Sequence, residues 1–289
     1  MNPRPTAYKA RLAVAWTDYR EWLYGKYSKT WARGVFNLSR KYHYMICGNL
    51  RDLDSFSKWK RNNTLKALIA LSKYLGIYEQ FKAKIKGYGI KWENQSSVES
   101  FLRMMNRKDG LMDWVKKSTN VLDKNLSTFI EFVMLSGIRR GEAINAFNLL
   151  IRLNKTGKLS SYYNSDLQSL EHFRFEDTFM RRTKNVFFTF LPKTFINRMT
   201  MCDPISYTTL KRRLKEHNLK LRLNELRDHY ATFMVHNGLI REEVDILQGR
   251  IGKSLFMRHY FSPNIAELKG KVLRAIGVMT NKAELKSLS

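Results

Sequence analysis

Ser136-Gly137-Ile138-Arg139-Arg140-Gly141-Glu142 connects two segments that both have the three- and four-residue spacing of an amphipathic helix. The apolar stripe before it consists of Phe129, Phe132, Val133 and Leu135, and the stripe after it of Ala143, Phe147 and Leu150. Gly137 therefore predicts the end of one helix, and Arg139 the start of the next. An arginine at a helix start adds its permanent charge to the positive end of the helix dipole, which suits a phosphate.

Two later segments carry similar chemistry. In Asn224-Glu225-Leu226-Arg227-Asp228-His229-Tyr230-Ala231-Thr232, we expect Asn224 to be an N-cap and Arg227 to lie in the first turn of a helix. Leu247-Gln248-Gly249-Arg250 follows, and Tyr260 comes ten residues after Arg250. Each segment alone is weak evidence, because Gly-x-Arg sequences are common.

Taken in order, the three segments resemble the signature of the tyrosine recombinase (phage integrase) family. The Ser-Gly-Ile-Arg-x-x-Glu element is similar to its first arginine box, the element ending at Arg227 to its second, and Leu-Gln-Gly-Arg with His259-Tyr260 to its terminal box. The residues of these three segments are most similar to those of the archaeal viral and plasmid integrases of the fusellovirus type. The resemblance covers roughly residues 122–276, and the helical half before it is compatible with the family's core-binding domain.

The resemblance implies a reaction at a DNA phosphate. Arg139 and Arg227 would bind the nonbridging oxygens, Arg250 would add a third donor, and Tyr260 would be the nucleophile. Arginine suits this role because its planar fork can bind two oxygens and it stays charged near neutrality. Attack would leave a 3′-phosphotyrosyl enzyme and a free 5′-hydroxyl, which permits rejoining without ATP, a metal or another cofactor.

The departing oxygen needs a proton, and Lys184 is our candidate general acid, with Lys193 as the alternative. The alternation around Phe173 and Phe175 and the β-branched and aromatic run 186–191 predict a β-hairpin. Its turn, residues 181–185, would place Lys184 at an exposed tip.

Because the helical spacing covers most of the chain and only this hairpin departs from it, the expected fold is mainly α-helical with a small antiparallel sheet.

Two positions depart from the family's pattern. Asn224 stands where a histidine or lysine is usual, and Arg250 where a histidine is common, so neither can transfer a proton at neutral pH. Helix capping is the interpretation we prefer for Asn224, with an accessory role as the alternative. Glu142 could orient Arg139 or cap the helix dipole, and His259 could be a neighbour of Tyr260 or a participant.

The composition agrees with a polyanionic partner. The 289 residues include 52 lysines and arginines against 25 acidic residues, a net charge of +27 that is spread along the chain. Ribosomal, chromatin and membrane-surface proteins carry similar charge, but nucleic acid is the partner that the charge favours. The family resemblance implies double-stranded DNA. No apolar run approaches the roughly 20 residues that span a bilayer, and the start lacks a signal-peptide core, so we expect a cytoplasmic, nucleoid-associated protein.

The length predicts two domains. Glycines and polar residues in 87–97 place the boundary, giving a helical DNA-binding domain over 1–90 and a tyrosine recombinase catalytic domain over 91–289.

The clearest N-terminal helix is Thr64–Leu75, ended by Gly76. The tryptophans 16, 22, 31 and 59 are expected in the core, and Cys47 and Cys202, too far apart for a disulfide framework or zinc site, are expected to be buried thiols. The candidate DNA-binding cations are Lys58, Lys60, Arg61, Lys66, Lys73, Arg140, Arg181 and Arg182.

The function expected from the resemblance is site-specific recombination or integration at DNA attachment sites by a homotetramer. Two alternatives stay open: a type IB topoisomerase-like enzyme, and a DNA-binding relative that has lost the reaction. After Pro263, Ile265, Leu268, Val272 and Ile276 form a stripe that could pack on a neighbouring subunit or equally on its own chain.

Overall fold

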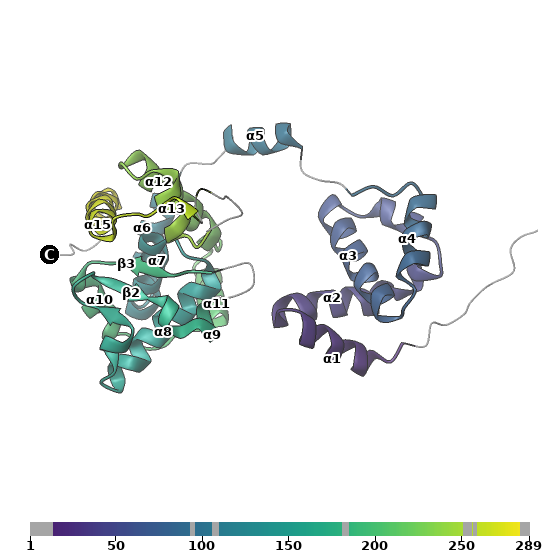
Figure 1. Cartoon of the computed structure of the whole chain (residues 1–289), viewed down its shortest axis with the longest axis horizontal. Helices are drawn as coiled ribbons and strands as arrows, with labels where there is room; N and C mark the ends of the chain where they lie inside the picture. The colour runs from purple at the N-terminus through teal and green to yellow at the C-terminus, as the bar shows by residue number, and fades with distance from the viewer. Residues whose placement is uncertain are drawn as a thin grey trace, which may run out of the picture. The chain divides into compact units, whose positions relative to one another are not determined.

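We describe the protein from a computed structural model, which covers residues 14–92, 96–105, 110–180, 185–250, 256 and 259–283. The chain forms two compact units, Met1–Arg107 and Lys108–Ser289 (Figure 1). Each unit has its own hydrophobic core.

The first unit is helical throughout its described part. Its elements are α1 (Trp16–Lys26), α2 (Lys29–Tyr42), the 3-10 helices η1 (His43–Ile46) and η2 (Arg51–Ser55), α3 (Lys58–Tyr74), α4 (Tyr78–Gly87) and α5 (Ser97–Met105). The predicted leucine stripe is confirmed, because Leu65, Leu68 and Leu71 are buried in α3 and pack with Tyr19 of α1. Gly76 ends this region with a φ of 73°, which glycine adopts without strain.

Part of the predicted core is wrong. Trp16 and Trp22 pack against the core of the first unit, but Trp31 is 39% and Trp59 is 76% exposed. The reason at Trp59 is that α3 begins at Lys58, before the predicted Thr64, and this added turn lies outside the leucine stripe. Cys202 is buried as expected, whereas Cys47 is exposed.

The second unit combines helices with one small sheet. Its elements are α6 (Leu111–Val121), α7 (Lys124–Ser136), α8 (Arg140–Lys155), η3 (Leu159–Ser161), β1 (Tyr163–Asn164), β2 (Ser169–Glu171), η4 (His172–Phe175), α9 (Glu176–Phe179), β3 (Phe188–Phe190), α10 (Lys193–Thr200), α11 (Tyr207–Glu216), α12 (Leu223–His236), α13 (Arg241–Leu247) and α15 (Ile265–Lys282).

Helix α7 is the centre of the second unit (Figure 1). It contacts α6, α8, α10 and α12, and nearly all of its residues are buried. A helix that is apolar on every side requires such an envelope of neighbours. Because the first arginine segment follows α7 directly, the buried helix fixes the position of Arg139.

The sheet has the strand order β1-β2-β3 with both pairs antiparallel, and Leu170 lies opposite Tyr163 and Thr189. The predicted second hairpin strand is confirmed as β3. The predicted first strand is wrong, because Phe173 and Phe175 lie in η4, and the strand that pairs with β3 is β2. The chain leaves β2 at His172, whose buried ring is held between the hydroxyls of Tyr162 and Thr189.

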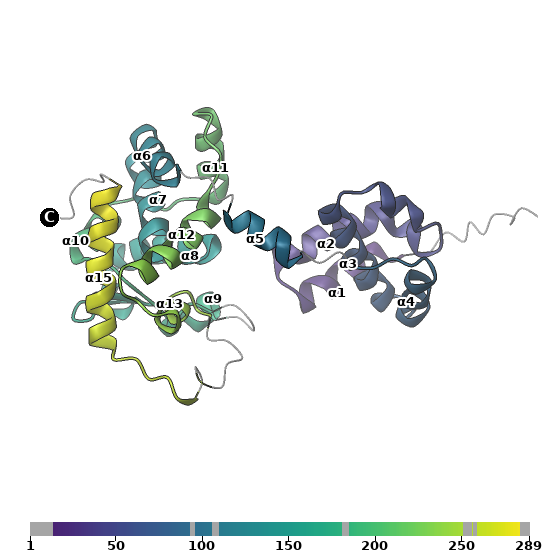
Figure 2. The ribbon, with the colours of Figure 1, turned by 90° about the horizontal axis from the view of Figure 1, so that it is seen from above.

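Helix α15 packs within its own unit, against α12 and β3, and Figure 2 shows it along its length. Leu268, Val272 and Ile276 are fully buried, while Ile265 at the start of the helix is 36% exposed. The apolar stripe after Pro263 therefore completes the core of its own chain. Among the residues that the structure covers, no helix is both long and apolar enough to cross a membrane.

Candidate active site

The junction between α7 and α8 has the predicted form. Gly137 ends α7 with a φ of 60°, and a Cβ there would overlap the ring of Tyr230 in α12. Glycine is thus required for both the backbone turn and the close packing of α7 against α12. Arg139 is the N-cap residue of α8, so it lies at the helix start as the sequence predicts.

Glu142 combines the two roles that the sequence left open. Its Oε2 accepts a hydrogen bond from the backbone N–H of Arg139 at 3.1 Å, and its Oε1 accepts one from Arg139 Nη1 at 2.9 Å. The carboxylate is fully buried, whereas the Arg139 side chain keeps 28% of its surface exposed. Glu142 therefore caps the helix and also fixes the direction of the Arg139 side chain, which still reaches solvent.

Arg227 is held differently from Arg139. It is the fifth residue of α12, so its predicted place in the first turn is wrong, and the dipole argument does not apply to it. It is 8% exposed, and its Nη1 and Nη2 donate to the carbonyl oxygens of Gly137 and Gln248, both at 2.8 Å. These two bonds use only part of its five N–H donors, and within the described residues the others make no hydrogen bond, so they can bind a ligand.

The residue before Arg250 is Gly249, at a position that has no room for a side chain. Gly249 has a φ of 62°, and a Cβ there would overlap the carbonyl oxygen of Asn185. The same carbonyl accepts a hydrogen bond from Arg139 Nη1 at 3.3 Å. The segments of Arg139, Asn185 and Arg250 therefore meet at one place.

The charges of the three arginines act on one another. Burial, followed by repulsion from Arg139 and Arg250, lowers the pKa of Arg227 to about 10, while Glu142 and Asp228 oppose the shift. Arg227 stays protonated at neutral pH, but in an environment that disfavours its charge. A bound anion would remove this repulsion, so the arrangement is suited to a phosphate.

Tyr260 is 77% exposed, and its backbone N–H donates to the carbonyl of Phe256. Its ring lies edge-on to the ring of His259, which is also exposed. Within the described part of the chain, no hydrogen bond or ring contact joins Tyr260 to the three arginines. The structure thus brings the arginines together and leaves the phenol accessible to solvent.

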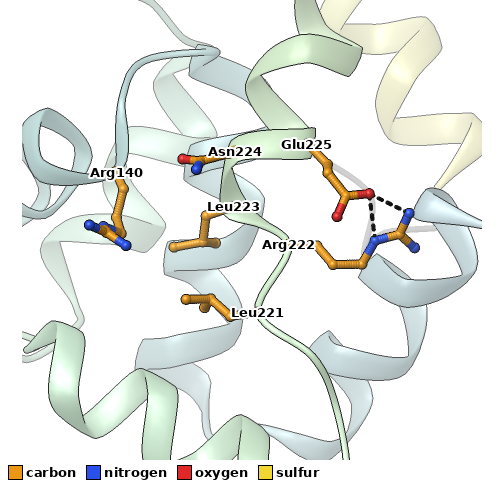
Figure 3. A pocket seen from close by; sticks show the side chains of 6 residues that line it. All are labelled: Arg140, Leu221, Arg222, Leu223, Asn224 and Glu225. Atoms are coloured by element: carbon orange, nitrogen blue, oxygen red, sulfur yellow. Dashed lines mark hydrogen bonds and ion pairs between the residues drawn. The ribbon is translucent and has the colours of Figure 1, made fainter. Parts of the chain in front are cut away.

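Asn224 lines a small pocket of about 160 Å³ beside Arg140 (Figure 3). Its predicted role as N-cap is wrong, because α12 begins at Leu223 and the cap residue is Arg222. Figure 3 shows the Asn224 amide on the Arg140 side of the pocket, away from the ion pair of Arg222 with Glu225. Arg140 itself stacks on the ring of Tyr207, 4.1 Å from its centroid.

The lysine candidates are placed unequally. Lys184, Arg181 and Arg182 lie outside the described residues. Lys193, the alternative acid, is exposed at the first position of α10. Asn185, which comes directly after Lys184 in the sequence, contacts both Arg139 and Gly249.

The cations of the first unit differ in their partners. Lys58 pairs with Glu99 at 3.0 Å, Arg61 lies 3.8 Å from Asp54, and Lys60 stacks 3.7 Å from the centroid of Phe56. Lys66 and Lys73 are exposed on α3, and Lys73 lies over the ring of Tyr78. Only part of this group is therefore available without a competing carboxylate.

Two further residues at the candidate site hold arginines, and no motif in the sequence points to this role. Gln248 and Asn185 both hold arginines, Gln248 through its backbone carbonyl to Arg227 and Asn185 through its own to Arg139. Every residue has a backbone carbonyl, so the residue type does not indicate which carbonyls bind an arginine. Only the polar side chain of Gln248, directly after two apolar residues, could have indicated a role at the site. The residues that the structure covers contain no group of three histidine, cysteine or acidic side chains that could hold a metal ion.

Comparison with known families gives an independent result. The sequence model of the archaeal phage integrase family matches residues 107–267, more than half of the chain and nearly all of the second unit up to α15. A search of curated proteins returned no match. The matched range contains Arg139, Arg227, Arg250 and Tyr260, and on this match the chain belongs to the archaeal phage integrase family.

Proposed function

We propose that this protein is a site-specific DNA recombinase that cleaves and rejoins DNA through a 3′-phosphotyrosyl intermediate on Tyr260. The observation that carries the proposal is the meeting of the three arginine segments. The Asn185 carbonyl accepts from Arg139 and lies against Gly249, which precedes Arg250. Arg227 donates to the carbonyls of Gly137 and Gln248 in the other two segments. Membership of an integrase family supports DNA as the substrate and integration as the biological context.

The arginines stabilise the phosphate as its charge grows in the transition state. Donors that are already fixed in place lower the barrier because they need no reorganisation during the reaction. Arg139 is fixed by Glu142, and Arg227 by two carbonyls. The Arg250 side chain is 46% exposed, and its guanidinium lies 3.8 Å from the Asp245 carboxylate.

In the cleavage step, Tyr260 Oη forms a bond to phosphorus while the bond from phosphorus to the 5′-oxygen breaks. The phenol, whose residue is 77% exposed, gives its proton to solvent water, and the leaving 5′-oxygen takes one from Lys184. We favour Lys184 over Lys193 because its neighbour Asn185 contacts Arg139, whereas Lys193 begins α10. The second step reverses these events with a 5′-hydroxyl from another strand as the nucleophile.

The two parts of the chain have different proposed functions. We assign DNA binding to the helical residues 1–90 and catalysis to residues 91–289, as the sequence predicts. The first unit carries Lys66 and Lys73 on the exposed side of α3. Exchange between two duplexes requires four cleavages with one tyrosine for each, so the active assembly on DNA is a homotetramer.

The two alternatives differ in testable ways. A type IB topoisomerase-like enzyme would form the same covalent bond but would not join two marked duplexes. A relative that only binds DNA is favoured by Asn224, which stands where a histidine or lysine is usual. Against it, the arginine cluster is built in detail, with every guanidinium held by a carbonyl or a carboxylate.

A suicide substrate tests the proposal. A duplex with a nick near the cleaved phosphate loses its short 5′-hydroxyl fragment after cleavage, so the covalent adduct accumulates and survives detergent. We expect an adduct from the wild type and none from Tyr260→Phe, which keeps the ring. An equal adduct from both proteins would disprove the nucleophile, and joining of two marked duplexes separates a recombinase from a topoisomerase.

A further inference from the structure

Gln248 is a fully buried amide at the end of α13, between the arginine segments. Its Nε2 donates to the backbone carbonyl of Arg227 at 2.9 Å and to that of Gly137 at 3.3 Å. These two carbonyl acceptors fix the orientation of the amide, because an oxygen in place of Nε2 would face both of them. One side chain therefore links the backbones of α12 and of the α7–α8 junction.

Arg227 returns these bonds with its guanidinium. Its Nη1 donates to the same Gly137 carbonyl that Gln248 binds, and its Nη2 donates to the backbone carbonyl of Gln248. The Gly137 carbonyl thus accepts from both side chains. The result is a closed hydrogen-bond network among Gly137, Arg227 and Gln248, which belong to three segments far apart in the sequence.

The remaining amide oxygen shows that packing alone does not explain this residue. Within the part of the chain that is described, no donor reaches Gln248 Oε1, although it is buried. A buried polar atom without a partner destabilises the folded state, and an apolar side chain of equal length would avoid it. The benefit of glutamine must therefore lie in what its Nε2 group holds.

We propose that Gln248 is a positioning residue, which sets the Arg227 guanidinium for the phosphate. Its Nε2 fixes the Gly137 carbonyl that Arg227 Nη1 binds. Its second bond, to the backbone carbonyl of Arg227, holds the end of α13, where the Gln248 carbonyl accepts from Arg227 Nη2. This inference rests on the proposed function. A displacement of a catalytic group by about 1 Å can slow a reaction by about 100-fold. The loss of the Nε2 bonds should therefore reduce cleavage while leaving the DNA-binding surface unchanged.

The first test compares two substitutions in single-turnover cleavage of the nicked duplex. Gln248→Met keeps the length of the side chain and removes the donor, so we expect cleavage to slow about 10- to 100-fold, with the Kd for DNA within about twofold. Gln248→Glu places carboxylate oxygens against two carbonyls and should slow cleavage at least as much. Cleavage at the wild-type rate by either folded variant would overturn the inference.

The second test is a double-mutant cycle with Arg227→Lys, which separates positioning from a general structural effect. If Gln248 acts through Arg227, Gln248→Met should slow the Arg227→Lys enzyme by less than threefold. If the two losses multiply, the inference is wrong. Thermal unfolding of each variant confirms that it is folded.

Failure of the proposed function would look different. In that case the wild type itself would form no covalent adduct, and no effect of Gln248 on cleavage could be measured. The measurement would then be the hydrogen-exchange rate of the Arg227 guanidinium protons in the DNA-free protein, because a guanidinium that is held by hydrogen bonds exchanges slowly. Faster exchange in Gln248→Met than in wild type would support the positioning role, and equal rates would overturn it.

Discussion

The backbone carbonyl of Asn185 accepts a hydrogen bond from Arg139 Nη1 at 3.3 Å and lies against Gly249. This contact brings Asn185, the residue after Lys184 in the sequence, to the segments of two candidate arginines, Arg139 and Arg250. It gives a structural reason to prefer Lys184 to Lys193 as the acid, because a neighbour in the sequence is already at the site.

Lys184→Ala should slow cleavage of ordinary DNA by about 100- to 10,000-fold, because general acid catalysis contributes on this scale. A substrate with sulfur in place of the 5′-bridging oxygen should restore the rate to within about tenfold, since a thiolate with a pKa near 8.5 leaves without a proton. Lys193→Ala is the matched control and should cleave both substrates normally. If sulfur rescues Lys193→Ala instead, the alternative lysine is the acid.

Arg139→Ala and Arg227→Ala should each slow cleavage by about 100-fold or more with little loss of DNA affinity, because both meet charge that grows in the transition state. Arg212→Ala, whose side chain on α11 is 67% exposed and pairs with Glu216, is the control for the loss of one positive charge. The measurements are the adduct rate under single turnover and the Kd by filter binding. Equal losses in rate and affinity would argue against the assigned roles.

Gly249→Ala should destabilise the protein by about 2–5 kcal/mol, the sum of a positive φ and an overlap with the Asn185 carbonyl. Gly157→Ala is the matched control, because Gly157 has a similar φ of 68° but open space around it. Its cost should be only the conformational part, about 1–2 kcal/mol. Urea unfolding measures both values, and equal costs would mean that the packing at Asn185 is loose.

His172 should make the protein sensitive to acid. Burial lowers its pKa to about 3 in the folded state, against about 6.5 in an unfolded chain. Below pH 6.5 the unfolded state therefore binds a proton that the folded state does not, and stability falls as the pH is lowered toward 3. We expect a loss of about 2 kcal/mol between pH 7 and pH 5 from this group.

His172→Gln is the control for this pH dependence, because an amide can serve the hydroxyls of Tyr162 and Thr189 without titrating. Between pH 7 and pH 5, the urea midpoint should fall less in the variant than in the wild type, and the difference measures the contribution of His172. An identical pH profile in both proteins would show that another group causes the acid sensitivity.

The sequence predicted helix ends better than strand ends. Gly137 marks a real stop, because glycine alone tolerates both its positive φ and its close contact with the ring of Tyr230. The Phe173 and Phe175 alternation was misleading, because a short 3-10 helix can also place two aromatic residues two positions apart. What decides the structure there is the buried His172, whose partners are Tyr162, just before β1, and Thr189 in β3, and local spacing does not reveal them.

The sequence indicates the charged residues of the candidate site but not the groups that hold them. Arg139, Arg227 and Arg250 stand out by motif and order, and Glu142 by its distance of three residues from Arg139. The carbonyls of Gly137, Asn185 and Gln248 belong to the backbone, so their role depends on tertiary packing alone. The buried position of Arg227, within α12 instead of at its start, follows from the same packing.

The cations of α3 should contribute unequally to DNA binding. The Lys58 ammonium donates a hydrogen bond to the Glu99 carboxylate, which lowers the pKa of Glu99 and partly neutralises Lys58. Lys66 is exposed, and in the described part of the chain no carboxylate pairs with it. Lys66→Ala should therefore weaken binding and lower the slope of log K against log salt by about one, the change expected for one phosphate contact.

Lys58→Ala should change that slope by less, because the wild-type ammonium must first give up Glu99 to reach a phosphate. Glu99→Gln is the diagnostic variant: it removes the competing carboxylate, so it should tighten binding and steepen the slope. Titrations of one duplex at several salt concentrations measure all three proteins on the same scale. If Lys58→Ala and Lys66→Ala lower the slope equally and Glu99→Gln leaves it unchanged, the ion pair does not compete with DNA.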